Sequence, residues 1–212
     1  MSGDSFLHFV EYELQVIALS WMAMLYIIKA YQLSRLPMPW ERAPKKGGSV
    51  PGILRTYAII FMPWAMESSR KHFWRWMEFG VYHIGAGVAI LNTFTFPFAP
   101  GLMTETTRLV FSILIALAIP IGLVKLARRI IRPEMRIIST PDDYFSLAAL
   151  ECFFLAAIIA LLTDAPPWRM AYFLITAGFL FYVPFSKISH YVYFLFAGLV
   201  TGSRYGLRGV IP

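Results

Sequence analysis

The run PFSKISHYVYF, Pro184–Phe194, lies in the last long apolar stretch of the chain, which we expect to form one helix over residues 168–199. The stretch is rich in aromatic residues, yet it carries Lys187 and, about one turn later, His190. An ionisable side chain inside hydrocarbon is costly and is normally paired, buried against protein or bound to a ligand. This helix therefore poses the question of what the ring nitrogen of His190 binds.

The composition of the whole chain predicts an integral membrane protein. Of its 212 residues, 58% are hydrophobic and 15% are charged. The apolar residues come in stretches of about 20, the length at which a helix crosses a bilayer. Few segments show the in–out alternation of a membrane β-barrel. The formal charge of +7 comes from basic residues between the apolar stretches, so it does not indicate nucleic-acid binding.

The apolar stretches predict an all-α bundle of five transmembrane helices, in a single domain covering residues 1–212. The expected spans are residues 6–30, 75–97, 107–127, 144–162 and 168–199. The connection at residues 31–74 begins with a loop, Leu36–Gly52, that proline and glycine break. Its apolar segment Thr56–Met66 is too short to span, so we expect it to lie in the membrane interface.

The charges of the connections predict the orientation of the bundle. Nine lysines and arginines lie between Lys29 and Arg75, and five lie between Lys125 and Arg136. Basic loops face the cytoplasm in membrane proteins. We therefore expect the N-terminus outside and the C-terminus in the cytoplasm.

Two histidines are expected at the same depth in antiparallel helices. His83 lies about eight residues into the second helix, and His190 about seven residues before the end of the fifth, so both are ~10–12 Å from the cytoplasmic end at 1.5 Å per residue. A haem held by two histidines between antiparallel helices needs such a level match. Arg75 and Lys187 are candidate contacts for the haem propionates. Small residues would let a flat macrocycle approach the helix around His83: Gly80, Gly85, Ala86 and Gly87.

The same residues also allow an interpretation in which the chain binds no haem. A histidine in a membrane helix can hydrogen-bond across helices, and small residues can mark ordinary close packing. His8 and His72 are expected at opposite membrane surfaces, where both suit interfacial side chains. His72 also suits a quinone or propionate contact, and His8 a role in proton exchange or in docking an external partner. Glu78 joins His72 as a candidate quinone or proton site, although it could instead pair with Arg75.

Glu151 is the most unusual carboxylate in the chain, because it lies in the middle of the fourth span beside Cys152. A carboxyl group at that depth is either protonated and hydrogen-bonded or part of a proton path. The sequence favours the structural role. Cys152 is the single cysteine, so an internal disulfide and an iron–sulfur cluster held by this chain alone are both excluded.

Two motifs resemble a known family. PFSKISH at Pro184–His190 is similar to the helix 5 motif of the cytochrome b gamma subunit of membrane-bound nitrate reductase. YHIG at Tyr82–Gly85 resembles that family's helix 2 motif. The resemblance implies that His83 and His190 are the axial ligands of a haem near the cytoplasmic face. It also implies a multi-pass protein of a prokaryotic cytoplasmic (inner) membrane.

The tail, SRYGLRGV at Ser203–Val210, resembles related subunits of sulfate-reducer transmembrane complexes and heterodisulfide-reductase-type complexes. Those subunits work with a cytoplasmic iron–sulfur protein, and some with an external multihaem cytochrome c. Two-haem members carry a further histidine on each of helices 2 and 5, where this chain has Thr93 and Tyr172. The departure implies a single haem b, with the outer haem absent.

These residues together predict a non-autonomous subunit of a quinone-linked oxidoreductase complex. It would pass electrons between menaquinone or another quinone, or an external cytochrome c, and a cytoplasmic iron–sulfur subunit. One alternative is a haem-free membrane anchor that docks redox subunits through its basic loops. A small transporter is a further alternative. The sequence speaks against it, because the chain lacks the inverted repeat typical of transporters. A second haem would require His8 or His72 as a ligand.

Overall fold

The computed structural model describes residues 3–37, 42–163 and 165–210, so residues 38–41 of the expected loop lie outside it. The described residues are mostly helical and contain no strand. We expected one domain, whereas the chain divides into two compact units. Unit 1 holds the residues up to Ala23 together with Met77–Ile188, and unit 2 holds Met24–Trp76 together with the residues from Ser189 onward. Each unit is described by itself.

Within the described ranges, five helical segments are long and apolar enough to cross a membrane. They are Ser5–Ser34, Phe73–Phe98, Glu105–Ile131, Pro141–Thr163 and Pro166–Phe185. The first combines helices α1 (Gly3–Glu11) and α2 (Glu13–Ser34), because backbone hydrogen bonds continue through Tyr12. The predicted class, an all-α multi-pass membrane protein with five spans, is confirmed at this level.

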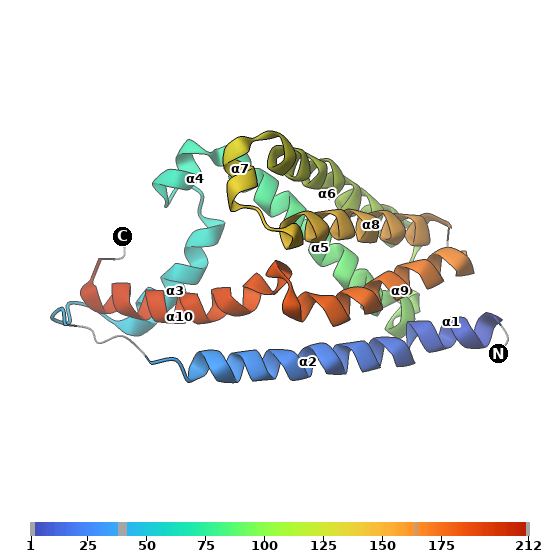
Figure 1. The fold of residues 1–212 in the computed structure, drawn as a ribbon, viewed down its shortest axis with the longest axis horizontal. Coiled ribbons are helices and arrows are strands. Elements are labelled where there is room, and N and C mark those ends of the chain that lie inside the picture. The colour runs from blue at the N-terminus through green and yellow to red at the C-terminus, as the bar shows by residue number, and fades with distance from the viewer. Residues whose placement is uncertain (1–2, 38–41, 164, 211–212) are drawn as a thin grey trace. The chain divides into compact units, whose positions relative to one another are not determined.

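Unit 1 is a helical bundle (Figure 1), and its core is rich in aromatic side chains. Helix α8 packs against both α6 and α9, and α1 packs against α9. Fully or almost fully buried side chains at their centre include Phe154, Tyr172 and Phe173. The helices that build it are α5 (Phe73–Phe98, from Met77), α6 (Glu105–Ile131), α7 (Pro133–Ile138), α8 (Pro141–Thr163) and α9 (Pro166–Tyr182).

Polar side chains fasten the first helix to the bundle. Gln15 Nε2 donates to the Phe173 carbonyl oxygen at 2.8 Å, and the Tyr12 hydroxyl donates to the Pro97 carbonyl oxygen at 2.8 Å. Arg169 Nη2 lies 2.7 Å from Glu11 Oε1. Such groups in an apolar helix need partners on neighbouring helices, because the membrane offers no water.

The fifth span is shorter than expected. Helix α9 ends at Tyr182, and two short 3-10 turns, Val183–Phe185 and Lys187–Ser189, precede a separate helix α10 (His190–Arg208). Pro184 has no N–H to donate to the preceding turn, which favours a break here. The backbone N–H of Lys187 donates to Asp142 Oδ2 at 2.8 Å instead of continuing the helix. The continuous helix predicted at residues 168–199 is therefore wrong in its second half.

Unit 2 is built on a close pair of helices, α3 (Ser49–Ala58) and α10, which lie side by side in Figure 1. Its other helices are the second part of α2 and the short α4 (Glu67–Lys71). Gly198, Gly202 and Gly206 share one face of α10, and all three are buried. A Cβ built at Gly202 would lie 2.7 Å from the Cα of Ile53. Glycines at this spacing let two backbones touch.

Candidate functional site

The ring of His83 is oriented by its own helix. His83 Nδ1 lies 2.7 Å from the Phe79 carbonyl oxygen one turn earlier. Since a carbonyl oxygen can only accept, Nδ1 carries the hydrogen. In the neutral ring Nε2 is then the unprotonated nitrogen, which is the one able to coordinate a metal. The Phe79 ring lies against the imidazole with its centroid 4.0 Å away.

The face of α5 around His83 carries glycines in place of larger side chains. Gly80 and Gly87 lie three residues before and four residues after His83, so they share its face of α5. A Cβ built at either glycine meets no atom within 4 Å. Gly85 faces elsewhere, because its Cβ would lie 2.5 Å from Ala118 Cβ on α6. The residues present thus fit a flat group that approaches α5 beside His83.

His190 is the first residue of α10 and is exposed. The sequence placed His190 about seven residues before the cytoplasmic end of one continuous fifth helix. Because a separate helix, α10, begins at His190, this estimate of its depth in the membrane does not apply. His190 belongs to unit 2, whereas His83 belongs to unit 1.

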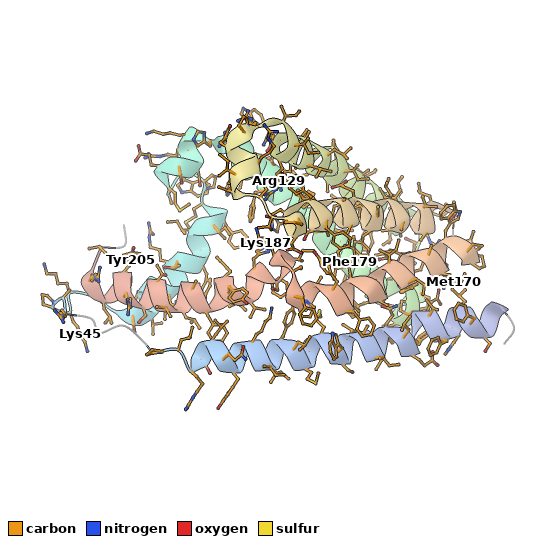
Figure 2. The ribbon with its side chains drawn as sticks, in the orientation of Figure 1. Lys45, Arg129, Met170, Phe179, Lys187 and Tyr205 are labelled. Atoms are coloured by element: carbon orange, nitrogen blue, oxygen red, sulfur yellow. The ribbon has the colours of Figure 1, made fainter. Side chains whose placement is uncertain are left out.

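Lys187, expected near a haem propionate, is held by an aspartate on α8. Its ammonium group forms a short ion pair with Asp143, whose other oxygen lies 3.3 Å from Arg129 Nη2. Thr140 donates to the same carboxylate through its backbone N–H at 2.8 Å. Figure 2 shows Lys187 and Arg129 at the same end of unit 1. This cluster ties the turn after α9 to α6 and α8.

Glu78, expected in a quinone or proton site or paired with Arg75, has a different partner. Both of its carboxylate oxygens accept hydrogen bonds of 2.7 Å from the guanidinium of Arg128 on α6. Arg75 is exposed in the first turn of α5, where its backbone N–H donates to the His72 carbonyl oxygen at 2.9 Å. The sequence carried no signal for the Arg128 pairing, because the partners are 50 residues apart.

The two remaining histidines are exposed. His72 ends the short helix α4, and its backbone N–H donates to the Ser68 carbonyl oxygen. His8 Nδ1 lies 3.3 Å from Glu13 Oε1, and its ring stacks on Tyr12 at 4.5 Å. Both placements suit the interfacial residues that the sequence favoured. Cys152 is likewise exposed on its helix.

The positions at which two-haem relatives carry further histidines are filled by packed side chains. Tyr172 is fully buried, and its hydroxyl donates to the Ala89 carbonyl oxygen at 2.7 Å. Its ring stacks on Phe153 at 5.5 Å. The Thr93 hydroxyl donates back to the Ile90 carbonyl oxygen at 2.7 Å within α5. Neither residue projects into open space.

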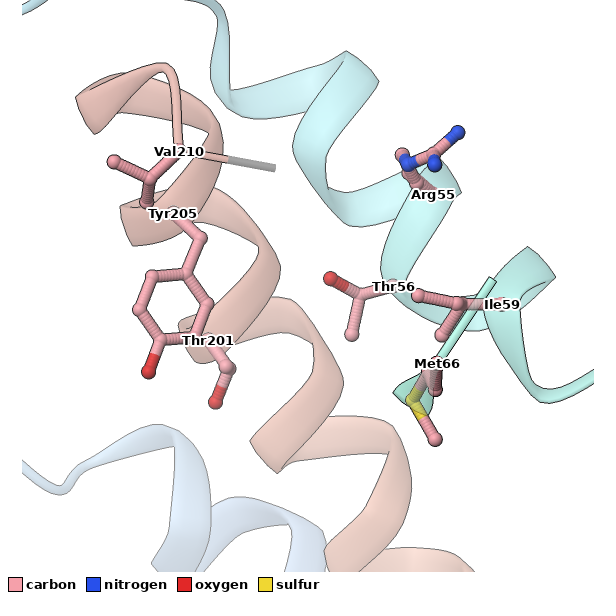
Figure 3. A pocket seen from close by; sticks show the side chains of 7 residues that line it. All are labelled: Arg55, Thr56, Ile59, Met66, Thr201, Tyr205 and Val210. Atoms are coloured by element: carbon pink, nitrogen blue, oxygen red, sulfur yellow. The ribbon is translucent and has the colours of Figure 1, made fainter. Parts of the chain in front are cut away.

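A pocket of about 340 Å³ lies in unit 2 between α3 and α10 (Figure 3). Its walls are mainly apolar, and Arg55 supplies the single charged lining group. The Nε of Arg55 is buried without a hydrogen-bond partner among the described residues. The seven lining residues are Arg55, Thr56, Ile59, Met66, Thr201, Tyr205 and Val210. The sequence signal that could have located this helix pair is the glycine spacing in α10.

The described residues contain no cluster of three or more histidine, cysteine, aspartate or glutamate side chains suited to a metal ion. A haem held by two histidines does not require such a cluster.

Comparison with known proteins finds a relative among the curated proteins. No protein-family model and no solved structure matches the chain. A curated protein of Nitratidesulfovibrio vulgaris (strain Hildenborough), named simply "Protein", is 31% identical over 172 residues, which cover 74% of this chain and 73% of the relative. That name states no activity. The identity and coverage show that the chain belongs to the same family as this Nitratidesulfovibrio vulgaris protein.

Proposed function

We propose that this protein is a membrane electron-transfer subunit that carries one haem b near its cytoplasmic face. The observation that carries the proposal is the hydrogen bond from His83 Nδ1 to the Phe79 carbonyl oxygen. It selects the tautomer in which Nε2 can bind iron and holds the ring on a face that Gly80 and Gly87 leave open. A bound haem would supply one-electron transfer.

His190 is proposed as the second axial ligand on the strength of the sequence motif alone. Arg75 and Lys187 remain proposed propionate contacts, although Lys187 would then share its charge between Asp143 and the propionate. Thr93 and Tyr172 support a single haem, because they stand where two-haem relatives carry histidine ligands, and Tyr172 is fully buried. The chain's own part is to ligate, orient and bury the haem.

The proposed setting is a prokaryotic cytoplasmic membrane, with the N-terminus outside and the C-terminus in the cytoplasm. The excess of lysine and arginine in the connections supports this orientation. The subunit would exchange electrons between menaquinone or another quinone, or an external multihaem cytochrome c, and a cytoplasmic iron–sulfur subunit. Anionic lipid also suits the basic connections.

Two places are proposed for the quinone. The sequence points to His72 and Glu78, and the pocket beside Arg55 offers a mainly apolar slot with one charged group. A photoreactive quinone analogue distinguishes them, because labelled peptides would come from residues 67–78 in one case and from α3 and α10 in the other. Labelling of neither region would contradict both assignments.

The test of the haem proposal is a reduced-minus-oxidised spectrum of the purified chain with a pyridine haemochrome count per polypeptide. We expect one b-type haem in the wild type and none in His83→Ala or His190→Ala. His8→Ala and His72→Ala are matched controls that should keep the haem. Full haem occupancy in either ligand variant would overturn the assignment. Two haems would bring in His8 or His72, and none in the wild type would leave the membrane anchor.

A further inference from the structure

A buried carboxyl group lies inside the bundle of unit 1, away from the face of His83. Glu151 on α8 is 6% exposed, and its carboxyl packs directly on Gly122 of α6. A Cβ built at Gly122 would lie 2.7 Å from the carboxyl carbon of Glu151 and 2.8 Å from Cε2 of Tyr82. Glycine at position 122 thus leaves the room in which the carboxyl group and the Tyr82 ring meet.

The polar atoms of this group lack ordinary partners. Neither carboxylate oxygen of Glu151, nor the Tyr82 hydroxyl, makes a hydrogen bond of normal geometry with any described group. An unpaired carboxylate in a low-dielectric interior is very costly, so the group must hold a proton or draw on a nearby positive charge.

A single ammonium group is within reach. Lys125, on α6, places its Nζ 4.0 Å from the centroid of the Tyr82 ring, and its charge acts on Glu151. Lys125 also interacts with the charges of Glu78 on α5 and of Arg128 and Arg129, the two arginines toward the end of α6. It is six residues before Ile131, the last residue of α6, or about 9 Å along the axis. Lys125 therefore lies between Glu151 and the basic end of the helix.

The third neighbouring helix brings no charge to the carboxyl group. Helix α9 also packs on α8, and its titratable residues are Arg169, Tyr172 and Tyr182. Arg169 pairs with Glu11 of α1. Tyr172 stacks on Phe153, and the Tyr182 hydroxyl contacts Ser146 and Asp142. Among the described residues, the ionisable groups that act on Glu151 are therefore Tyr82 and Lys125.

We infer that Glu151 is a proton-exchange site inside the membrane, loaded from the basic end of α6 through Lys125. In the loading step the Lys125 ammonium gives one proton to the Glu151 carboxylate. The products are a neutral amine and a carboxylic acid, and the amine regains its proton from water at the basic end. Tyr82 stays neutral and walls the site. The inference uses no residue proposed to bind haem, and its test is independent of haem content.

The test is labelling of the full chain in membranes with dicyclohexylcarbodiimide, an apolar reagent that attacks protonated carboxyl groups. Adducts are mapped by peptide mass spectrometry over a series of pH values. We expect an adduct on Glu151 whose rate of formation falls about tenfold per pH unit above its midpoint, as the protonated fraction does. Glu78, bound by Arg128, serves as an internal control that stays unlabelled.

Two variants separate a proton site from a packed side chain. Glu151→Gln, which keeps the shape, should remove the adduct while the yield of folded protein is unchanged. Lys125→Met should increase labelling at neutral pH several-fold, because the charge that favours the carboxylate is gone. Lys71→Met, at an exposed ion pair with Glu67, is the matched control and should leave labelling unchanged.

The infrared carbonyl band of protonated Glu151, identified by its loss in Glu151→Gln, is a second measurement that needs no reagent access. A band that disappears as the pH rises would support the inference even if labelling is slow. Labelling or a band that does not change with pH would overturn it, since the carboxyl would then be permanently protonated. Absence of both the adduct and the band at every pH would overturn it as well.

Discussion

Glu78 on α5 and Arg128 on α6 form an ion pair through two parallel hydrogen bonds, each of 2.7 Å. The paired geometry matches the fork of the guanidinium to the two carboxylate oxygens, which makes this pair more specific than a single contact. The side chains are 27% and 36% exposed, respectively, so the surrounding medium screens the pair only in part. The pair holds α5, which carries His83, against α6, which carries Lys125.

Removing one member of this pair should loosen α5 from α6. Glu78→Gln keeps the size of the side chain but loses its charge, and we expect a loss of about 1–2 kcal/mol in the free energy of unfolding. Thermal unfolding in detergent measures it. In the double variant Glu78→Gln with Arg128→Met, the total loss should be smaller than the sum of the single losses. Additive losses would show that the two charges do not interact.

Gly122→Ala should disturb the carboxyl group of Glu151. The new methyl would overlap Glu151 Oε1 and press on Tyr82, and overpacking of this kind costs about 1–3 kcal/mol. Gly178→Ala on α9 is the control, because a Cβ there meets nothing within 4 Å. The variants are compared by their thermal midpoints. Equal midpoints for the two alanine variants would contradict the close approach of Glu151 to Gly122.

Gly202→Val should separate α10 from α3. The added side chain would begin 2.7 Å from the Cα of Ile53 and 2.9 Å from the carbonyl oxygen of Gly52, and neither backbone atom can move aside. We expect faster proteolysis within the connection at residues 42–61 and the loss of the pocket beside Arg55. Ala197→Val, at an exposed position of α10 outside the pocket lining, should leave the cleavage rate nearly unchanged.

Gly87→Leu tests the open face beside His83. A leucine there meets no protein atom near its Cβ, and it replaces a poor helix former, so the helix should gain up to about 1 kcal/mol of stability. The same side chain would occupy the face that we assign to the haem, so the haem content per polypeptide should fall. Unchanged haem content in a stably folded variant would place the haem elsewhere.

Tyr172→Phe should weaken the core of unit 1. The change removes the hydroxyl that donates to the Ala89 carbonyl oxygen and accepts from Asn92 Nδ2 at 3.3 Å. Leaving those buried groups unpaired costs about 1–3 kcal/mol, measurable as a lower thermal midpoint. Haem content should stay at the wild-type value, because no ligand is altered. A haem loss would link Tyr172 to the cofactor directly.

Local properties of the sequence were sufficient to predict the membrane class and the existence of five spans. Length and apolarity decide whether a segment can cross a bilayer, and both are read within a window of about 20 residues. The ends of the first four spans agree with the structure to within a few residues. The hydrogen bond that orients His83 also belongs to this local level, because Phe79 lies one helical turn away.

The tertiary structure decided the end of the fifth span and the partners of the charged side chains. Pro184 allows either a bend or a break, and Asp142 and Asp143, more than 40 residues away, hold the turn that follows α9. The sequence offered Arg75 as a partner for Glu78, and only the packing of α5 on α6 selects Arg128. Apolar periodicity specifies which segments are helices. It carries no information on which polar groups meet, because that depends on contacts between residues far apart in the chain.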